Sequence, residues 1–297
     1  MLPLPGKSSS IDLSGAVAIG MHDSTELQIS IGPQRYRADL SGRCDLGITL
    51  NFNGPQPNCF AAPAAQATPL RVQAFTGSVD AGASCNCSTY TLTPHCNGTH
   101  TECIGHITRE PVSIGAIAVP DFAAARLISV QPLGARSTDE PIPESAGLDD
   151  LLITRSLLEQ AATPAALAGC SALIVRTLPN SSTKLERHYS ISRQTPYFTV
   201  QAIQWMVDAG LTHLVVDLPS LDRLQDGGKL LAHRTFWGMP AGAVDALSAS
   251  RPEATITEMA FIPDEIADGV YLLSLQIAPF AGDAAPSRPV IFPLRAL

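Results

Sequence analysis

The chain has 297 residues, of which 45% are hydrophobic and 15% charged, and a formal net charge of −8. This composition is typical of a globular protein with a sizeable core, built as one large domain or two. The acidic balance argues against nucleic acid or an anionic membrane as the main partner, and no apolar run is long enough to span a membrane. The N-terminal residues lack a basic region followed by an apolar core, so we expect no secretory signal, a cytoplasmic location and reduced cysteines.

The first third of the chain is predicted to be β-structure. Residues 16–19 and 26–31 have strand-like composition, and residues 32–33 (Gly-Pro) predict the turn that leads to a return strand at 35–40. Residues 53–69 are rich in proline, alanine and asparagine and predict a long loop.

The middle of the chain alternates strands with short helices. We expect a strand at 124–130, a polar connector from 132 to 149, and helical pieces at 157–160 and 165–167. Residues 172–177 are almost continuously apolar, which predicts a central strand buried on both faces.

The final third has one clear helix. Thr199 is a candidate N-cap for a helix with apolar residues at helical spacing, and Gly210 is placed to end that helix. Strands are predicted at 214–216, 270–277 and 289–292. The sum is a strand-rich α/β fold with few helices.

The side chains best suited to bind a metal or to catalyse a reaction lie within residues 96–106. If this segment is one extended strand, Cys96, His100, Glu102 and His106 project to the same side, since side chains alternate between two faces. A thiol, an imidazole and a carboxylate that point into one space are suited to bind a metal such as zinc. His106 lies further along and could be a ligand or a proton carrier.

This pattern resembles the motif of the cyclase or kynurenine-formamidase-like family of metal-dependent hydrolases, roughly H-x-G-T-H-x-D-x-P-x-H. Residues 98–100 (Gly-Thr-His), the acidic Glu102 and His106 fit the motif. Cys96 stands where the first histidine is expected, Glu102 replaces aspartate, and Ile104 replaces proline.

A second region strengthens the resemblance. The predicted helix and strand end in Asp217-Leu218-Pro219-Ser220-Leu221-Asp222, similar to the family's D-x-P-S-x-D run, and a downstream histidine and glutamate are matched by His233 and Glu258. The resemblance covers residues 36–297 as one cyclase-like domain, whereas we expect residues 1–35 to be a β extension without family signal.

The resemblance implies a single swivelling β/β/α domain and a hydrolase of amide-type bonds. The implied metal ligands are Cys96, His100, Glu102, His233 and Glu258, with His106 in acid–base chemistry and Asp217, Ser220 and Asp222 in support. We expect Zn²⁺, which a Cys96 thiolate would favour because soft sulfur suits soft metals, with Mn²⁺ as the alternative. The implied substrate is an N-formyl arylamine such as N-formylkynurenine, an intermediate of tryptophan catabolism to kynurenine, or a cyclic amide or imide. Family members are commonly oligomers, so we expect a homodimer or homotetramer.

Several alternatives stay open. His95 could take the place of Cys96, and Glu253 or Glu265 could take the place of Glu258. The changes at Cys96 and Glu102 could leave a family member without activity. A protein of another class would hold a structural metal between His100 and a set of cysteines, namely Cys85, Cys87, Cys96 and Cys103.

Overall fold

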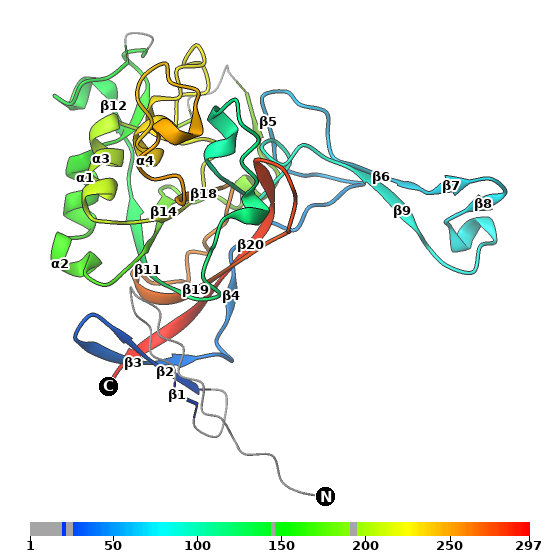
Figure 1. Cartoon of the computed structure of the whole chain (residues 1–297), viewed down its shortest axis with the longest axis horizontal. Helices are drawn as coiled ribbons and strands as arrows, with labels where there is room; N and C mark the ends of the chain where they lie inside the picture. The colour runs from blue at the N-terminus through cyan, green and yellow to red at the C-terminus, as the bar shows by residue number, and fades with distance from the viewer. Residues whose placement is uncertain (1–19, 22–25, 144–145, 191–194) are drawn as a thin grey trace, which may run out of the picture.

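The computed structural model describes residues 20–21, 26–143, 146–190 and 195–297. Its centre is a closed ring of seven strands. In order around the ring these are β20 (Ala284–Ala296), β10 (His100–Glu102), β18 (Thr255–Glu258), β17 (His213–Val216), β14 (Ala172–Thr177), β11 (Ala123–Val130) and β19 (Gly269–Ile277). The ring closes because β19 pairs with β20, the long red strand that runs down to the C-terminus in Figure 1.

Four neighbouring strands of the ring, β11, β14, β17 and β18, run parallel. β10 is antiparallel to its neighbours β18 and β20, and β19 is antiparallel to its neighbours β11 and β20. All six residues of β14 are buried, as predicted for a central strand. Successive residues of these strands belong to two apolar clusters on opposite faces. Leu127, Ile174 and Val215 lie in one cluster, and Leu173 and Leu214 lie in the other.

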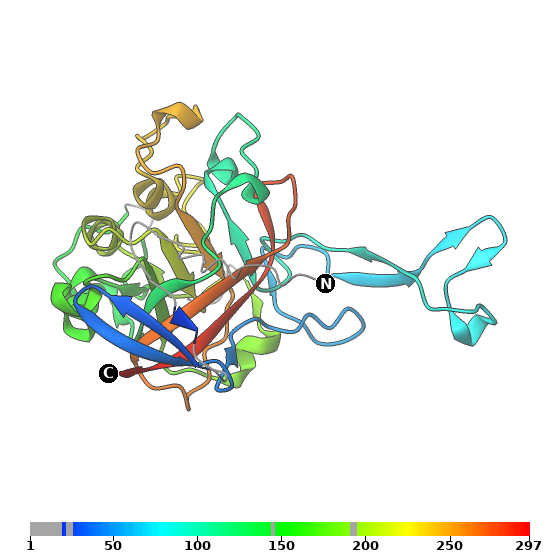
Figure 2. The same cartoon turned by 60° about the horizontal axis from the view of Figure 1, so that its bottom comes forward.

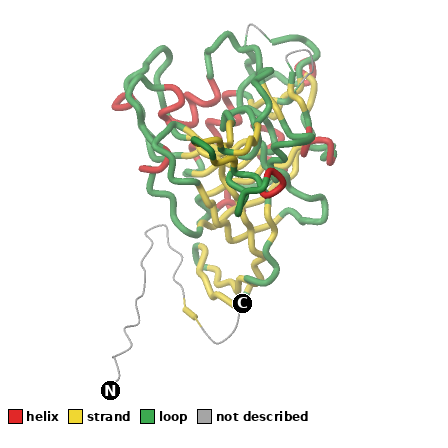
Figure 3. The backbone as a smooth tube through the Cα atoms, turned by 90° about the vertical axis from the view of Figure 1, so that its right-hand side faces the viewer, coloured by secondary structure: helices red, strands yellow, loops and turns green. Residues whose placement is uncertain are grey.

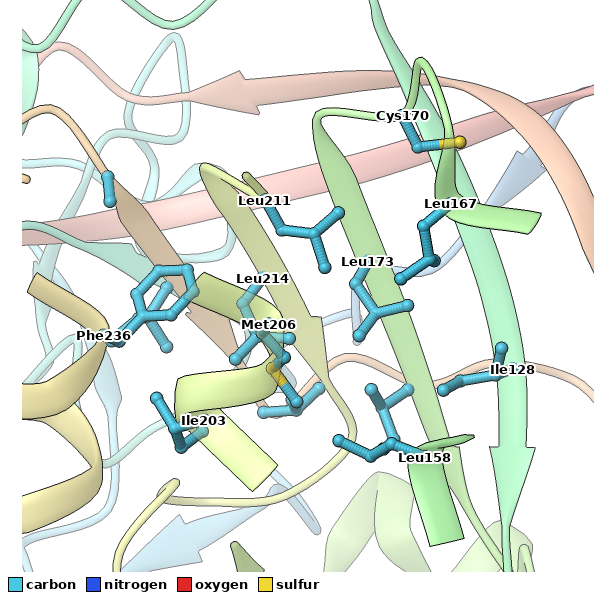
Figure 4. Packing of buried hydrophobic residues seen from close by; sticks show 14 of the residues in the cluster. Ile128, Leu158, Leu167, Cys170, Leu173, Ile203, Met206, Leu211, Leu214 and Phe236 are labelled. Carbon is cyan, nitrogen blue, oxygen red and sulfur yellow. The ribbon is translucent and has the colours of Figure 1, made fainter. Parts of the chain in front are cut away.

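Helices cover the second of these faces. Leu158 of α1 (Arg155–Ala161), Ile203 and Met206 of α3 (Val200–Asp208) and Phe236 of α4 (Leu231–Trp237) belong to the same cluster as Leu173 (Figure 4). The helices therefore lie outside the ring, and the first cluster fills its interior. The short helix α2 (Pro164–Leu167) begins with proline at its first turn, where the missing N–H costs nothing.

An N-terminal hairpin extends the sheet. Strand β2 (Glu26–Ile31) pairs with β3 (Gln34–Asp39), as predicted, and β3 pairs with the end of β20. The two-residue strands β1 (Gly20–Met21) and β4 (Cys44–Asp45) pair with β2 and β20. The strand predicted at 16–19 lies outside the described residues.

A ribbon from residues 66 to 91 leaves the ring and projects outward (Figures 1 and 2). It consists of β6 (Gln66–Pro69) paired with β9 (Ser88–Thr91), and of β7 (Arg71–Val72) paired with β8 (Phe75–Thr76). The predicted loop at 53–69 thus ends inside this ribbon. Beside the ring there are two small sheets, β12 (Leu133–Gly134) with β13 (Leu151–Ile153) and β16 (Tyr197–Phe198), and β5 (Asn58–Cys59) with β15 (His188–Tyr189).

The backbone trace in Figure 3 shows how much of the chain is strand or loop and how little is helix. The predicted helix at 200 is confirmed, with the Thr199 hydroxyl accepting a hydrogen bond from the Ala202 N–H. In the described part of the chain, no helix is both long enough and apolar enough to cross a membrane.

One local prediction is wrong. Residues 96–106 do not form one strand, because only His100–Glu102 pairs with β18 and β20. Gly98, with φ of +132°, ends a turn before β10, and residues Ile104–Ile107 form a 3₁₀ turn after it. Cys96 and His106 therefore do not share a face with His100 and Glu102 through simple alternation.

Candidate metal centre

Two facing strands carry the centre of the site. His100 and Glu102 begin and end β10, so they point to the same side of that strand. In the antiparallel pairing of β10 with β18, His100 lies directly opposite Glu258, and the His100 Nε2 atom is 3.5 Å from Glu258 Oε2. All three side chains are buried, which brings two carboxylates and an imidazole together away from water.

His233 reaches this group from helix α4. The Asp222 carboxylate accepts hydrogen bonds from the backbone N–H groups of Ala232 and His233, so it caps the helix whose own N-cap residue, Leu230, provides no side-chain hydrogen bond. The same carboxylate lies 2.6 Å from His233 Nδ1. The other ring nitrogen, Nε2, then lies 3.0 Å from Glu102 Oε1 and 3.4 Å from Glu258 Oε1.

His95 and His106 complete the group from the turns on either side of β10. His95 Nδ1 lies 3.0 Å from Glu102 Oε2, and His106 Nε2 lies 3.9 Å from the same oxygen. The planes of the two rings are tilted by 31°, and their centroids are 4.2 Å apart. We call the six residues His95, His100, Glu102, His106, His233 and Glu258 the His/Glu cluster.

The cluster has a buried floor and an open rim. The side chains of Glu102 and His100 are 1% and 0% exposed, whereas those of His95 and His106 are 22% and 27% exposed. A cavity of about 230 Å³ lies elsewhere, beside Thr177, Lys184 and Tyr189, and no cluster residue lines it. A small molecule would therefore approach the cluster from the side of His95 and His106.

The cluster is strongly polarised. Burial raises the pKa of Glu102, but the charges of His106 and His233 outweigh it and hold that pKa well below its usual range. Burial lowers the pKa of His95, yet its contacts with Asp283 and Glu102 raise it to about 10. The pKa of His233 is likewise raised, because the Glu102 charge and the Asp222 contact outweigh burial. The negative potential that holds these protons would also attract a divalent cation.

The inward-facing atoms fit a metal ion. Ligand atoms from His95, Glu102 and His106 lie within 4.8 Å of one another, and so do those from His100, Glu102 and Glu258. Within the described ranges, both Glu102 oxygens and the Nε2 atoms of His100 and His233 are buried without a hydrogen-bond partner of normal geometry. Buried polar atoms are costly when unpaired, and coordination of a cation would satisfy them. Glu102 belongs to both groups, so the site could hold one or two ions.

Four of the five expected metal ligands lie together in the structure, and the fifth, Cys96, does not join them. The structure brings His100, Glu102, His233 and Glu258 together, and it puts His95 rather than Cys96 against Glu102. Cys96 is buried, but no cysteine joins the candidate ligand groups of the described residues. Nitrogen and oxygen ligands suit both zinc and manganese, so this set gives no sulfur-based preference for zinc.

The competitors for Glu258 lie outside the cluster, since Glu253 and Glu265 are both exposed. Cys85 is exposed too, and Cys87 lies just before β9 in the projecting ribbon. All seven cysteines are free.

Of the three residues expected to support the site, Asp222 contacts a cluster histidine, Ser220 contacts Asp222, and Asp217 lies elsewhere. Asp222 contacts His233 directly, and the Ser220 hydroxyl accepts a hydrogen bond from the Asp222 N–H. Asp217 lies away from the cluster, where its carboxylate accepts hydrogen bonds from the Thr177 N–H and hydroxyl and from the Lys184 ammonium group. It therefore joins the ends of β14 and β17 and does not contact the cluster histidines.

The sequence matches the family model described as "Putative cyclase" over residues 12–223. The chain belongs to this cyclase family. The match begins within the N-terminal stretch for which we expected no family signal, and it ends before His233 and Glu258, whose positions beside Glu102 and His100 are seen in the structure. No curated protein matches the sequence.

Solved structures of cyclase-type hydrolases share the fold. An isatin hydrolase bound to the product analogue thioisatinate has a TM-score of 0.51 at 16% identity, with 85% of this chain and 92% of that chain covered. Isatin hydrolase A from Labrenzia aggregata, bound to benzyl benzoate, has a TM-score of 0.53 at 11% identity, with 84% and 93% covered. A "predicted metal-dependent hydrolase from Bacillus stearothermophilus" has a TM-score of 0.52 at 14% identity, with 84% and 97% covered. The predicted fold class is confirmed.

Proposed function

We propose that this member of the cyclase family is a metal-dependent hydrolase of amide-type bonds. The observation that carries the proposal is the convergence of four imidazoles and two carboxylates, in which both Glu102 oxygens and the Nε2 atoms of His100 and His233 are buried without a hydrogen-bond partner of normal geometry. The hydrolases that share the fold support the same reaction class.

His95, His100, Glu102, His233 and Glu258 would hold the metal. Glu102 belongs to both groups of neighbouring ligand atoms, and His233 Nε2 lies 3.0 Å from Glu102 Oε1. We propose His95 in the place that the motif gave to Cys96, because His95 Nδ1 is the atom that faces Glu102. When bound, the ion would supply a Lewis acid that polarises a carbonyl and lowers the pKa of water. We keep Zn²⁺ as the first metal to test and Mn²⁺ as the second.

His106 is suited to move a proton at the rim of the site. Its Nε2 atom lies 3.9 Å from Glu102, further than the nearest atoms of His95 and His233, and its ring is partly exposed. A water molecule that adds to the carbonyl carbon forms the new C–O bond and gives up one proton, which we propose His106 accepts, and the C–N bond then breaks. The departing nitrogen needs a proton, which we propose His106 delivers from the open side.

The proposed substrate class comes from the family resemblance. We propose an N-formyl arylamine, with N-formylkynurenine giving kynurenine and formate as in tryptophan catabolism, or a cyclic amide or imide, the class to which isatin belongs. The second class draws support from the isatin hydrolases that share the fold. We propose a cytoplasmic homodimer or homotetramer as the working form.

Elemental analysis of the purified protein, with parallel assays on N-formylkynurenine, isatin and a cyclic imide, tests the proposal. We expect one or two divalent ions per chain and hydrolysis of at least one substrate. The matched control is Glu102→Gln, which keeps the shape of the side chain but removes the shared anionic ligand, and it should lose both metal and activity. A wild-type chain that takes up no Zn²⁺ or Mn²⁺ and hydrolyses none of the three would contradict the proposal. Metal uptake without hydrolysis would indicate a family member that has lost activity.

A further inference from the structure

One carboxylate outside the sequence motif contacts two histidines of the cluster. Asp283 lies just before β20, and its Oδ2 atom is 2.9 Å from His95 Nε2 and 3.3 Å from His106 Nδ1. Its backbone carbonyl also accepts a hydrogen bond from the Cys103 N–H, at the end of β10. Asp283 is thus tied to the strand that carries the site and to the rings on both sides of it.

The other cluster histidines show the same arrangement. The outer nitrogen of His233 contacts Asp222, and that of His100 contacts the Gly98 carbonyl oxygen at 3.0 Å. An acceptor at the outer nitrogen keeps a proton there, which leaves the inner nitrogen free to bind a metal. Asp283 does this for His95 and His106 together. In His95 the nitrogen that faces the site is Nδ1, whereas in His100, His106 and His233 it is Nε2.

We propose that Asp283 is a positioning residue that orients both His95 and His106. Its carboxylate directs His95 Nδ1 toward Glu102 as a metal ligand, and it turns His106 Nε2 toward the same space for proton transfer. This inference rests on the proposed metal-dependent hydrolase. Asp283 is not part of the sequence motif around His100. The turn between β19 and β20 brings its carboxylate to His95 and His106.

The test compares Asp283→Asn with Asp283→Glu and with a control, Asp121→Asn, which neutralises an exposed aspartate before β11. Asparagine removes the negative charge and replaces one acceptor oxygen with an NH₂ donor, whereas glutamate keeps the charge and both acceptor oxygens. Zinc affinity is measured by competition with a chelator. We expect it to fall about 10- to 100-fold in Asp283→Asn, to recover partly in Asp283→Glu, and to stay unchanged in the control.

A second measurement reads the ring nitrogens directly. Two-bond ¹⁵N–¹H spectra of zinc-loaded, histidine-labelled protein should show His95 bound through Nδ1 with its proton on Nε2, and Asp283→Asn should lose this pattern. The signal of His213, on a strand of the ring, reports whether each variant is folded. If wild type takes up zinc and Asp283→Asn keeps both its affinity and its His95 pattern, the positioning role is wrong while the proposed function stands. If wild type takes up no metal, both the positioning role and the proposed function are wrong.

Discussion

We predict that a buried histidine outside the cluster, His213, makes the stability of the protein depend on pH. His213 is the first residue of β17, whereas the segment that contains Asp222 follows the last residue of that strand. The His213 side chain is 5% exposed. Its Nδ1 atom lies 2.9 Å from the Thr255 hydroxyl. Burial lowers the pKa of His213 from 6.5 to about 4, so the folded state favours the neutral ring.

The sign and size of the effect follow from this shift. Below pH 6.5 the unfolded chain binds a proton at His213, whereas the folded chain binds it only near pH 4. The free energy of unfolding therefore decreases as the pH falls from 6.5 to about 4. A shift of about 2.5 pKa units corresponds to about 3 kcal/mol. For a chain of this size, that loss lowers the melting temperature by about 5 °C.

The perturbation is His213→Gln, which keeps a polar group for Thr255 and cannot be charged. Urea unfolding of wild type and variant at about pH 7.5 and about pH 4.5 gives four free energies of unfolding. We expect wild type to lose about 2 to 3 kcal/mol more than the variant between the two values, since every other titrating group contributes equally to both proteins. Equal losses in the two proteins would refute the assignment of this pH dependence to His213.

Three further changes test the site. His100→Ala should remove most of the bound metal, measured by elemental analysis, because it deletes an inward-facing ligand opposite Glu258, while the exposed His188→Ala should keep a full complement. His106→Ala should lower turnover by about 10² to 10⁴ with near-normal metal content if the ring carries a proton, and a parallel fall in metal would make His106 a ligand instead. The double variant Cys85→Ser, Cys87→Ser should keep metal and activity, because the cluster contains no group from the ribbon. Loss of both properties would favour a structural thiol site.

Local structure was readable from the sequence where the information is itself local. The apolar run of residues 172–177 predicted a central strand, and Thr199 predicted the start of α3, since burial pattern and capping act over a few neighbouring residues. The shared direction of His100 and Glu102 also follows from the alternation within one short strand. The family motif added the fold class, which the described structure bears out.

The composition of the complete cluster was decided by tertiary structure. Nothing near His100 in the sequence says that Glu258 lies opposite it, because strand register depends on the packing of the whole ring. The choice of His95 over Cys96 depends on the turn before β10, where Gly98 adopts a positive φ and strand alternation no longer applies. Asp283 had no sequence signal at all. Side-chain direction within a strand is a local property, whereas the meeting of strands, turns and helix ends at one point is fixed only when the apolar faces of the ring and the helices are buried together.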